Sequence, residues 1–384
     1  MKKVTFTLIL LLPFIQGCGL SGAYIFFGDK AWNNYKESVK NSQFDEAQKY
    51  VKAAFSNYKD SLTYDEKRYP SVYLKLAETS YIIRKNPSES LGWINRGLKN
   101  VPDNYHLMAG LGKYIFVKAK LAKQDGKYEE LINEAKEHYR AALISDPLDP
   151  DFNSGLMKVF FDEIEKNKFE AKESKNKFLI TQVEELFENL IDVNVTSIEE
   201  ARGVLAFLTG DYKTAIEKLS LVLQEEYVRY EDSRSRYYLA RSYVESKRYS
   251  DAIDVATNVL NINDDDFQIR GERVIAYYLI GDKSAGALDL EWMEKKAPKY
   301  HEFFYRLGRL FYKQNLSKKA QLYLLKAFRL DGENGNYAYA LGENYLLEGN
   351  TRAARKFFDR AVSAAPVGSA LEKRSQQRLT EIGG

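Results

Sequence analysis

A constant spacing between similar residues constrains the fold of this 384-residue chain more than any other feature. Compact residues recur at this spacing in two columns, Ala240, Val274, Gly308 and Gly342, then Ala252, Gly286, Ala320 and Ala354. An aromatic column follows the first by three residues, at Tyr243, Tyr277, Phe311 and Tyr345. The period lies within the range of roughly 20 to 50 residues that is typical of stacked repeat units. Columns that recur in step predict such a stack, in which each unit buries its apolar face against its neighbours.

Each unit has the pattern of two antiparallel helices. The compact residue of the first column lets a partner helix approach, and the aromatic one turn later fills the space beyond it. An apolar column, Val259, Met293, Ala327 and Ala361, keeps one face of the second helix buried. The units end at Asp264, Pro298, Gly332 and Pro366, where proline or another breaker stops the helix. The pattern predicts an all-α fold.

This pattern resembles the tetratricopeptide repeat (TPR). Its cleanest copies contain Leu307, Gly308, Phe311, Ala320 and Ala327, then Leu341, Gly342, Tyr345, Ala354, Ala361 and Pro366. The resemblance implies a TPR-like α-solenoid, which is a superhelix of antiparallel helical hairpins. With looser copies toward the N-terminus, we expect about nine hairpins between Asp29 and Pro366.

The N-terminus has the layout of an export signal. Lys2 and Lys3 precede a largely apolar run from Val4 to Ile15, and Gly17 stands directly before Cys18. This arrangement resembles the bacterial lipoprotein signal. The resemblance implies that diacylglycerol is attached to the Cys18 thiol, that the chain is cut before this residue, and that the new amino group is acylated.

Gln16 and Pro13 depart from the strict lipoprotein pattern, and no charge occurs from Val4 to Gly28, so two other interpretations of the N-terminus stay open. The segment could be an uncleaved anchor, or a leader that is cut elsewhere. Cys18 is the only cysteine of the chain, and Gly19 after it resembles lipoproteins sorted to an outer membrane. Tyr24, Phe26 and Phe27 are expected near lipid headgroups, against a partner or a second copy, or packed on the first helix.

These patterns divide the chain into six expected segments. They are a lipoprotein signal peptide (1–17), a lipidated tether (18–28), degenerate TPR-like hairpins (29–150), an elongated helical hairpin (151–200), a C-terminal TPR array (201–366), and a capping helix with a tail (367–384).

Composition excludes several classes of function. Lys plus Arg number 57 against 54 Asp plus Glu, so no net field favours a nucleic acid. A single cysteine allows no intrachain disulfide, and the three scattered histidines suggest no metal site. Gly110 and Gly112 indicate a helix contact and not a phosphate loop, since the motif around them is incomplete. We therefore expect no enzyme and no cofactor.

Repeats of this type bind partners along the first helices of the hairpins. Positions beside the first compact column give a candidate protein-binding groove, Tyr237, Arg241, Tyr278, Tyr305, Arg309, Tyr312, Tyr339 and Glu343. Tyrosine and arginine often dominate interface energies. The same tyrosines could instead line a solvated groove or pack between hairpins. The chaperone-binding subfamily places lysine and asparagine at these positions, so this chain departs from its clamp.

The leading hypothesis is a membrane-anchored scaffold that mediates protein–protein interactions in outer-membrane, pilus or secretion assembly. Its expected location is the outer membrane, facing the periplasm, and its partners are envelope proteins or peptides, with homo-oligomers possible. The alternative is a periplasmic lipoprotein that holds a small ligand or hydrophobic cargo for a transporter.

Overall fold

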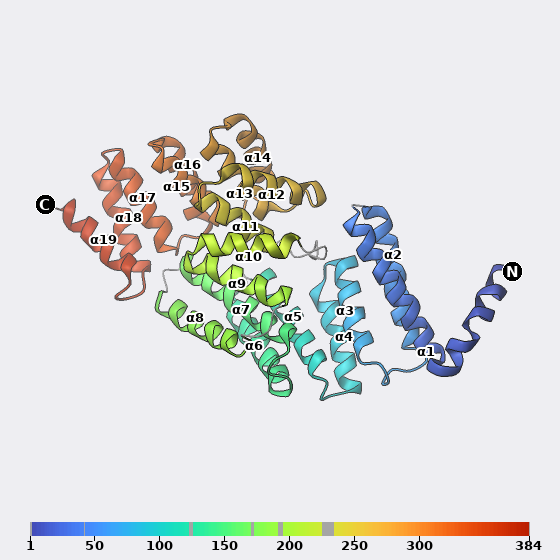
Figure 1. Ribbon diagram of the computed structural model, residues 1–384. Helices are drawn as coiled ribbons and strands as arrows, with labels where there is room; N and C mark the ends of the chain where they lie inside the picture. The colour runs from blue at the N-terminus through green and yellow to red at the C-terminus, as the bar shows by residue number, and fades with distance from the viewer. Residues whose placement is uncertain are drawn as a thin grey trace. The chain divides into compact units, whose positions relative to one another are not determined.

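The computed structural model describes residues 2–41, 43–122, 126–169, 173–190, 195–224 and 234–383. The side chains of residues 2–18, 169, 224 and 262 are outside this description, and with them the predicted lipidation of Cys18. All regular structure in the described ranges is helical, in nineteen helices. The chain divides into two units, Met1–Val159 and Phe160–Gly384, and each is built of antiparallel helix pairs (Figure 1). The predicted all-α, TPR-like solenoid fold is confirmed.

The N-terminal unit consists of three hairpins and the first part of a seventh helix. Within each hairpin the two helices pack side by side, and the second helix also packs on the first helix of the next hairpin. The helices are α1 (Lys2–Lys40), α2 (Phe44–Ser61), α3 (Ser71–Arg84), α4 (Pro87–Asn100), α5 (Tyr105–Leu121), α6 (Tyr128–Ser145) and α7 (Pro150–Phe169), which continues past Val159.

The segment expected to be a tether is helical. Gly19 interrupts α1 with φ 68°, and the helix resumes after it. The Ser21 hydroxyl donates to the Ser61 carbonyl oxygen at 3.0 Å, so α1 packs on α2 from this point. A Cβ atom at Gly28 would lie 2.4 Å from the Tyr58 ring, which shows how closely the two helices approach. Contact with α2 thus extends the first hairpin to Ser21.

Of the aromatic residues expected near lipid, against a partner or packed locally, Tyr24 is packed locally and Phe26 is exposed. Tyr24 stacks on Tyr64 with ring centroids 5.5 Å apart, whereas Phe26 remains 46% exposed. No helix in the part of the chain that the structure describes is both long and apolar enough to span a bilayer.

The C-terminal unit continues the hairpin pattern and ends in a single helix. Successive first helices of the hairpins, α9, α11, α13, α15 and α17, contact one another, and α19 packs on both helices of the last hairpin. The helices are α8 (Glu173–Glu188), α9 (Thr196–Thr209), α10 (Tyr212–Gln224), α11 (Arg234–Glu245), α12 (Tyr249–Ile262), α13 (Phe267–Ile280), α14 (Lys283–Lys296), α15 (His301–Lys313), α16 (Ser317–Leu330), α17 (Gly335–Leu347), α18 (Thr351–Ala364) and α19 (Ala370–Glu381).

The turn inside each hairpin repeats with the same period. Lys247, Gly281, Asn315 and Gly349 follow one another at the repeat spacing, and all four have positive φ, from 57° to 94°. Glycine and asparagine adopt this left-handed conformation at little cost, and it ends the first helix. Asp282 and Asn350 then accept a hydrogen bond from a backbone N–H of the second helix and fix where it begins.

The compact columns lie where the two helices of a hairpin touch, as the spacing predicts. Gly308 and Ala320 are buried between α15 and α16, and Gly342 and Ala354 between α17 and α18. A Cβ atom at Gly308 would lie 3.0 Å from the backbone nitrogen of Leu324, which cannot rotate away. Glycine at this position therefore sets the distance between the helices.

Candidate functional site

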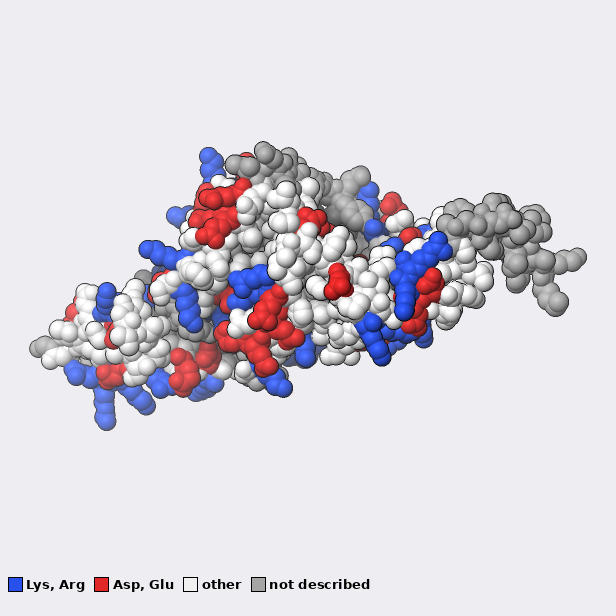
Figure 2. Space-filling view, turned by 90° about the horizontal axis from the view of Figure 1, so that it is seen from below, with Lys and Arg blue, Asp and Glu red and all other residues white. Residues whose placement is uncertain are grey.

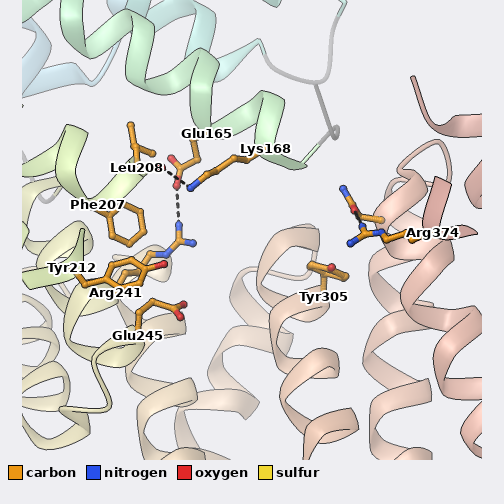
Figure 3. Close-up of a pocket in the computed structure, with 10 residues that line it drawn as sticks. Glu165, Lys168, Phe207, Leu208, Tyr212, Arg241, Glu245, Tyr305 and Arg374 are labelled. Atoms are coloured by element: carbon orange, nitrogen blue, oxygen red, sulfur yellow. Dashed lines mark hydrogen bonds and ion pairs between the residues drawn. The ribbon is translucent and has the colours of Figure 1, made fainter. Parts of the chain in front are cut away.

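A cavity of about 260 Å³ lies in the C-terminal unit, and the first helices of its hairpins supply most of the lining. We call it the groove cavity. Its lining residues are Glu165 and Lys168 of α7, Phe207 and Leu208 of α9, Tyr212 of α10, Arg241 and Glu245 of α11, Tyr305 of α15, Asn336 of α17 and Arg374 of α19. Figure 3 shows the residues of α7 to α11 on one side and Tyr305 with Arg374 on the other.

Arg241 organises the first wall of the groove cavity. Its Nη1 donates to a carboxylate oxygen of Glu165 and to the Tyr237 hydroxyl, both at 2.8 Å, and its guanidinium lies 4.9 Å from the centre of the Phe207 ring. Lys168 donates to the Leu208 carbonyl oxygen at 2.7 Å. Burial lowers the pKa of Lys168, and nearby Arg241 lowers it further. Both cations on this wall are thus bound to protein oxygens (Figure 3).

A buried ion pair lies next to Arg241. Both terminal guanidinium nitrogens of Arg306 donate to the two carboxylate oxygens of Glu272, and one of these bonds measures 2.8 Å. The Glu272 side chain is 1% exposed, and the Nε atom of Arg241 lies 4.0 Å from it. The pair joins α13 to α15. Arg241 thus lies beside the Glu165 carboxylate, and Arg306 lies beside the Glu272 carboxylate.

Glu302 is the carboxyl group that this network leaves least satisfied. Its Oε1 lies 3.7 Å from Nη1 of Arg241 and accepts no hydrogen bond from any described residue. Burial raises the pKa of Glu302 to about 7, and the charge of Glu165 acts in the same direction. Arg241 and Arg306 oppose this rise. Near neutral pH, Glu302 therefore passes between a neutral and a charged form.

We expect the stability of the C-terminal unit to fall as pH rises through 7. The folded chain holds the Glu302 proton to higher pH than the unfolded chain, whose ordinary value is 4.5. The contribution of the protonated Glu302 side chain to the free energy of unfolding is complete below pH 4.5 and is lost as the pH rises through about 7. Glu302→Gln should therefore raise unfolding stability at pH 8 by roughly 1 to 3 kcal/mol and change it little at pH 4.

Urea unfolding at the two pH values, followed by circular dichroism, measures this effect. Glu291→Gln on the exposed face of α14 is the matched control and should behave like the wild type at both. An equal effect of Glu302→Gln at pH 4 and pH 8 would contradict the assigned titration.

The second wall of the groove cavity holds an oriented arginine. Nη2 of Arg374 donates to the Asn336 side-chain oxygen at 2.7 Å, and the guanidinium lies 4.5 Å from the centre of the Tyr339 ring. Tyr305 packs against Tyr337 with ring centroids 4.7 Å apart, and burial raises its pKa. These contacts fix an aromatic and a cationic group at the cavity surface.

Two of the predicted groove residues are core residues. Tyr237 is 3% exposed, and its hydroxyl accepts from Arg241 inside the network. Tyr278 is 9% exposed and packs edge-on against Phe311 at 5.2 Å. Both were predicted to present their rings for binding. The structure corrects this, because their helix positions face neighbouring helices.

The other predicted residues divide between the groove cavity and its surroundings. Arg241 and Tyr305 line the cavity. Arg309 lies over the half-buried Tyr312 at 5.7 Å, and neither lines the cavity. Tyr339 supports Arg374, and Glu343 forms an ion pair with Arg378 of α19 at 2.8 Å. The terminal helix thus covers part of the predicted groove.

The sequence prediction missed most of the lining and the ion pair beside it. Glu272 and Arg306 are one repeat period apart, and each lies two positions before the compact column. Opposite charges at one column of adjacent repeats could have indicated their pairing. Arg374 follows the repeats and belongs to no column, so no periodic signal marks it.

Charges of both signs are dispersed over the face shown in Figure 2. On this face, Lys and Arg side chains lie close to Asp and Glu side chains. Among the residues that the structure describes, no group of three or more His, Cys, Asp or Glu could hold a metal ion.

Comparison with solved structures finds other helical-repeat proteins. A tetratricopeptide repeat protein from Parabacteroides merdae has a TM-score of 0.46 and 16% identity, over 71% of this chain and 99% of its own. A thermophilic TPR protein of Thermus thermophilus has a TM-score of 0.40 and 21% identity, over 48% of this chain and 100% of its own. Human IFIT1, solved as a dimer with PPP-AAAA, has a TM-score of 0.49 and 17% identity, over 88% of this chain and 82% of its own.

The family comparison agrees with the repeat pattern. Residues 273–369 match the sequence profile of the tetratricopeptide repeat family. This range contains both of the cleanest repeat copies. A search of curated proteins finds no match to the chain.

Proposed function

We propose that this protein is a membrane-anchored adaptor of the bacterial cell envelope that binds segments of other proteins in the groove cavity. The observation that carries the proposal is the cavity lining, where tyrosines and arginines of α10, α11, α15 and α19 are held by hydrogen bonds and ring contacts. Tyrosine and arginine dominate the energetics of protein interfaces, and preorganised side chains lose less entropy on binding. Tetratricopeptide repeats serve as protein-interaction scaffolds, and residues 273–369 match that family.

The membrane part of the proposal rests on Cys18 and on the packing of α1. An acylated Cys18 would lie three residues before Ser21, whose hydroxyl is bonded to α2. This short connection would span at most roughly 10 Å, so the lipid would hold the first hairpin close to the bilayer. Gly19 supports an outer-membrane location, since an aspartate is absent there.

The alternative of a hydrophobic-cargo protein fits the groove cavity poorly. An apolar molecule would cover Glu165, Lys168 and Glu245, and burial of charged groups against an apolar surface costs free energy. The cavity of about 260 Å³ also falls below the roughly 300 to 1,000 Å³ of typical small-molecule sites.

Affinity capture from solubilised envelopes tests whether the groove cavity binds proteins. We expect Tyr305→Ala to weaken capture of the native partner by about five- to thirty-fold, the effect of removing a hot-spot side chain. Leu322→Ala, at a 59% exposed site on α16, is the control and should leave capture unchanged. Equal capture by the Tyr305 variant and the wild type would place the binding face elsewhere.

A further inference from the structure

Two charged groups of the groove cavity, the Glu245 carboxylate and the Arg374 guanidinium, have hydrogen-bonding atoms that form no hydrogen bond with a described residue. The Glu245 carboxylate on α11 has no hydrogen-bond or ion-pair partner among the described residues. Arg374 on α19 uses one N–H on Asn336, and none of its other N–H groups bonds to a described residue. Figure 3 shows the two side chains on opposite sides, each directed toward the space between them.

Glu165 and Lys168 of α7 already bond to other residues of the protein. Glu165 accepts from Arg241 at 2.8 Å and from the Tyr238 hydroxyl at 3.0 Å. Lys168 is bound to the Leu208 carbonyl oxygen. A ligand that enters the cavity therefore meets the Glu245 carboxylate, whose charge also acts on Lys168, on one side, and the Arg374 guanidinium with Tyr305 on the other.

Arg374 is built to receive a carboxylate. Its guanidinium is held between the Asn336 amide and the face of Tyr339, which leaves a planar set of donors free. Such a planar donor set matches the two oxygens of a carboxylate. The terminal helix, expected only to cover the end of the stack, thus completes the cavity.

We propose that the groove cavity recognises a partner segment that carries one basic and one acidic side chain, the basic one on Glu245 and the acidic one on Arg374. This inference rests on the proposed function. A segment with two like charges would place one of them against its own sign, so the cavity rejects it. The cavity volume suits a few side chains of a protein segment better than an enclosed small molecule.

Fluorescence anisotropy with synthetic peptides tests the inference on the full chain in lipid nanodiscs. The probes share one neutral sequence and carry one Lys and one Asp at varied separation and in both orders, or two Lys, or two Asp. We expect the best mixed-charge peptide to bind about ten-fold tighter than either like-charge peptide. Arg374→Ala and Glu245→Ala should each weaken its binding by about five- to thirty-fold. The controls Arg352→Ala and Glu291→Ala, at exposed sites on α18 and α14, should not.

A charge exchange gives the sharpest result. The double variant Glu245→Lys with Arg374→Glu should bind the same peptide after its Lys and Asp are exchanged, and should lose preference for the original. Equal binding of mixed-charge and like-charge peptides would overturn the inference. So would equal effects of Arg374→Ala and Arg352→Ala, or a small zwitterion that native mass spectrometry finds bound and that displaces the peptide. If envelope capture still depends on Tyr305, the adaptor function survives that failure.

Discussion

Cys18→Ala is expected to abolish incorporation of radioactive palmitate and to release the chain from the acyl anchor. No other cysteine is present to accept a lipid, so the loss should be complete and not partial. Each buried methylene of an acyl chain contributes about 0.8 kcal/mol to membrane binding, and several chains together hold a protein on the bilayer. The expected difference is therefore the largest that any single substitution in this protein should give.

Labelling followed by electrophoresis measures both processing and lipidation. The variant should keep residues 1–17 and migrate above the processed wild type, while circular dichroism of the purified variant stays helical. Undiminished labelling of the variant would contradict the assigned lipid site, and normal processing without label would favour a leader cut independently of Cys18.

Arg306→Leu is expected to destabilise the C-terminal unit strongly. The Glu272 side chain is 1% exposed and would lose both of its hydrogen bonds from Arg306, with Arg241 at 4.0 Å as the nearest remaining cation among the described residues. Removing one partner of a buried ion pair costs about 3 to 5 kcal/mol, because the other charge stays buried without compensation. Urea unfolding followed by circular dichroism should show this loss.

A double variant separates the charge effect from the loss of volume. Glu272→Leu with Arg306→Leu removes both charges and should recover most of the stability, since apolar replacements of buried pairs are often neutral. Arg309→Leu, three residues later on the same helix and without an ion pair to any described residue, should change stability by less than about 0.5 kcal/mol. A double variant as unstable as Arg306→Leu alone would show that packing, and not the unpaired charge, sets the cost.

The repeat columns predicted the fold of the C-terminal half because they encode local contacts. A compact residue such as Gly308 contacts the second helix of its own hairpin, which is close in sequence. One repeat period therefore contains both helices of the contact, and the next period places the next hairpin beside it. The left-handed turn at Lys247 obeys the same period without glycine. The columns therefore predict the positions of the turns and of the helix contacts, although the residues between the columns differ from repeat to repeat.

The start of the folded region was not predictable in the same way. Residues 18–28 were expected to form a lipidated tether before the first hairpin, and Gly19 and Gly22 have low helix propensity. In the folded protein, contact with α2 outweighs that weak preference, and Gly28 is needed because the Tyr58 ring occupies the place of a side chain. Helix propensity depends on the local sequence and does not predict packing against a helix that lies further along the chain, such as α2.

The candidate site was predicted only in part. Arg241 and Tyr305 were found because they lie one position after and three positions before the compact column, where first helices face the groove. The prediction failed at Tyr237, which lies three positions before the column, and at Tyr278, which lies four positions after it, because both rings are enclosed by neighbouring helices. Glu245 and Arg374 depend on how successive helices curve around the cavity, which spacing within one repeat does not specify.

Site-specific photo-crosslinking in intact cells tests the central claim, that the groove cavity binds a protein segment, most directly. A photoreactive phenylalanine at position 305 lies on the cavity lining, and the same residue at position 322 lies on the exposed face of α16. We predict a discrete crosslinked envelope protein from position 305 that is absent from position 322. The same product from both positions, or a product from position 322 alone, would contradict the claim.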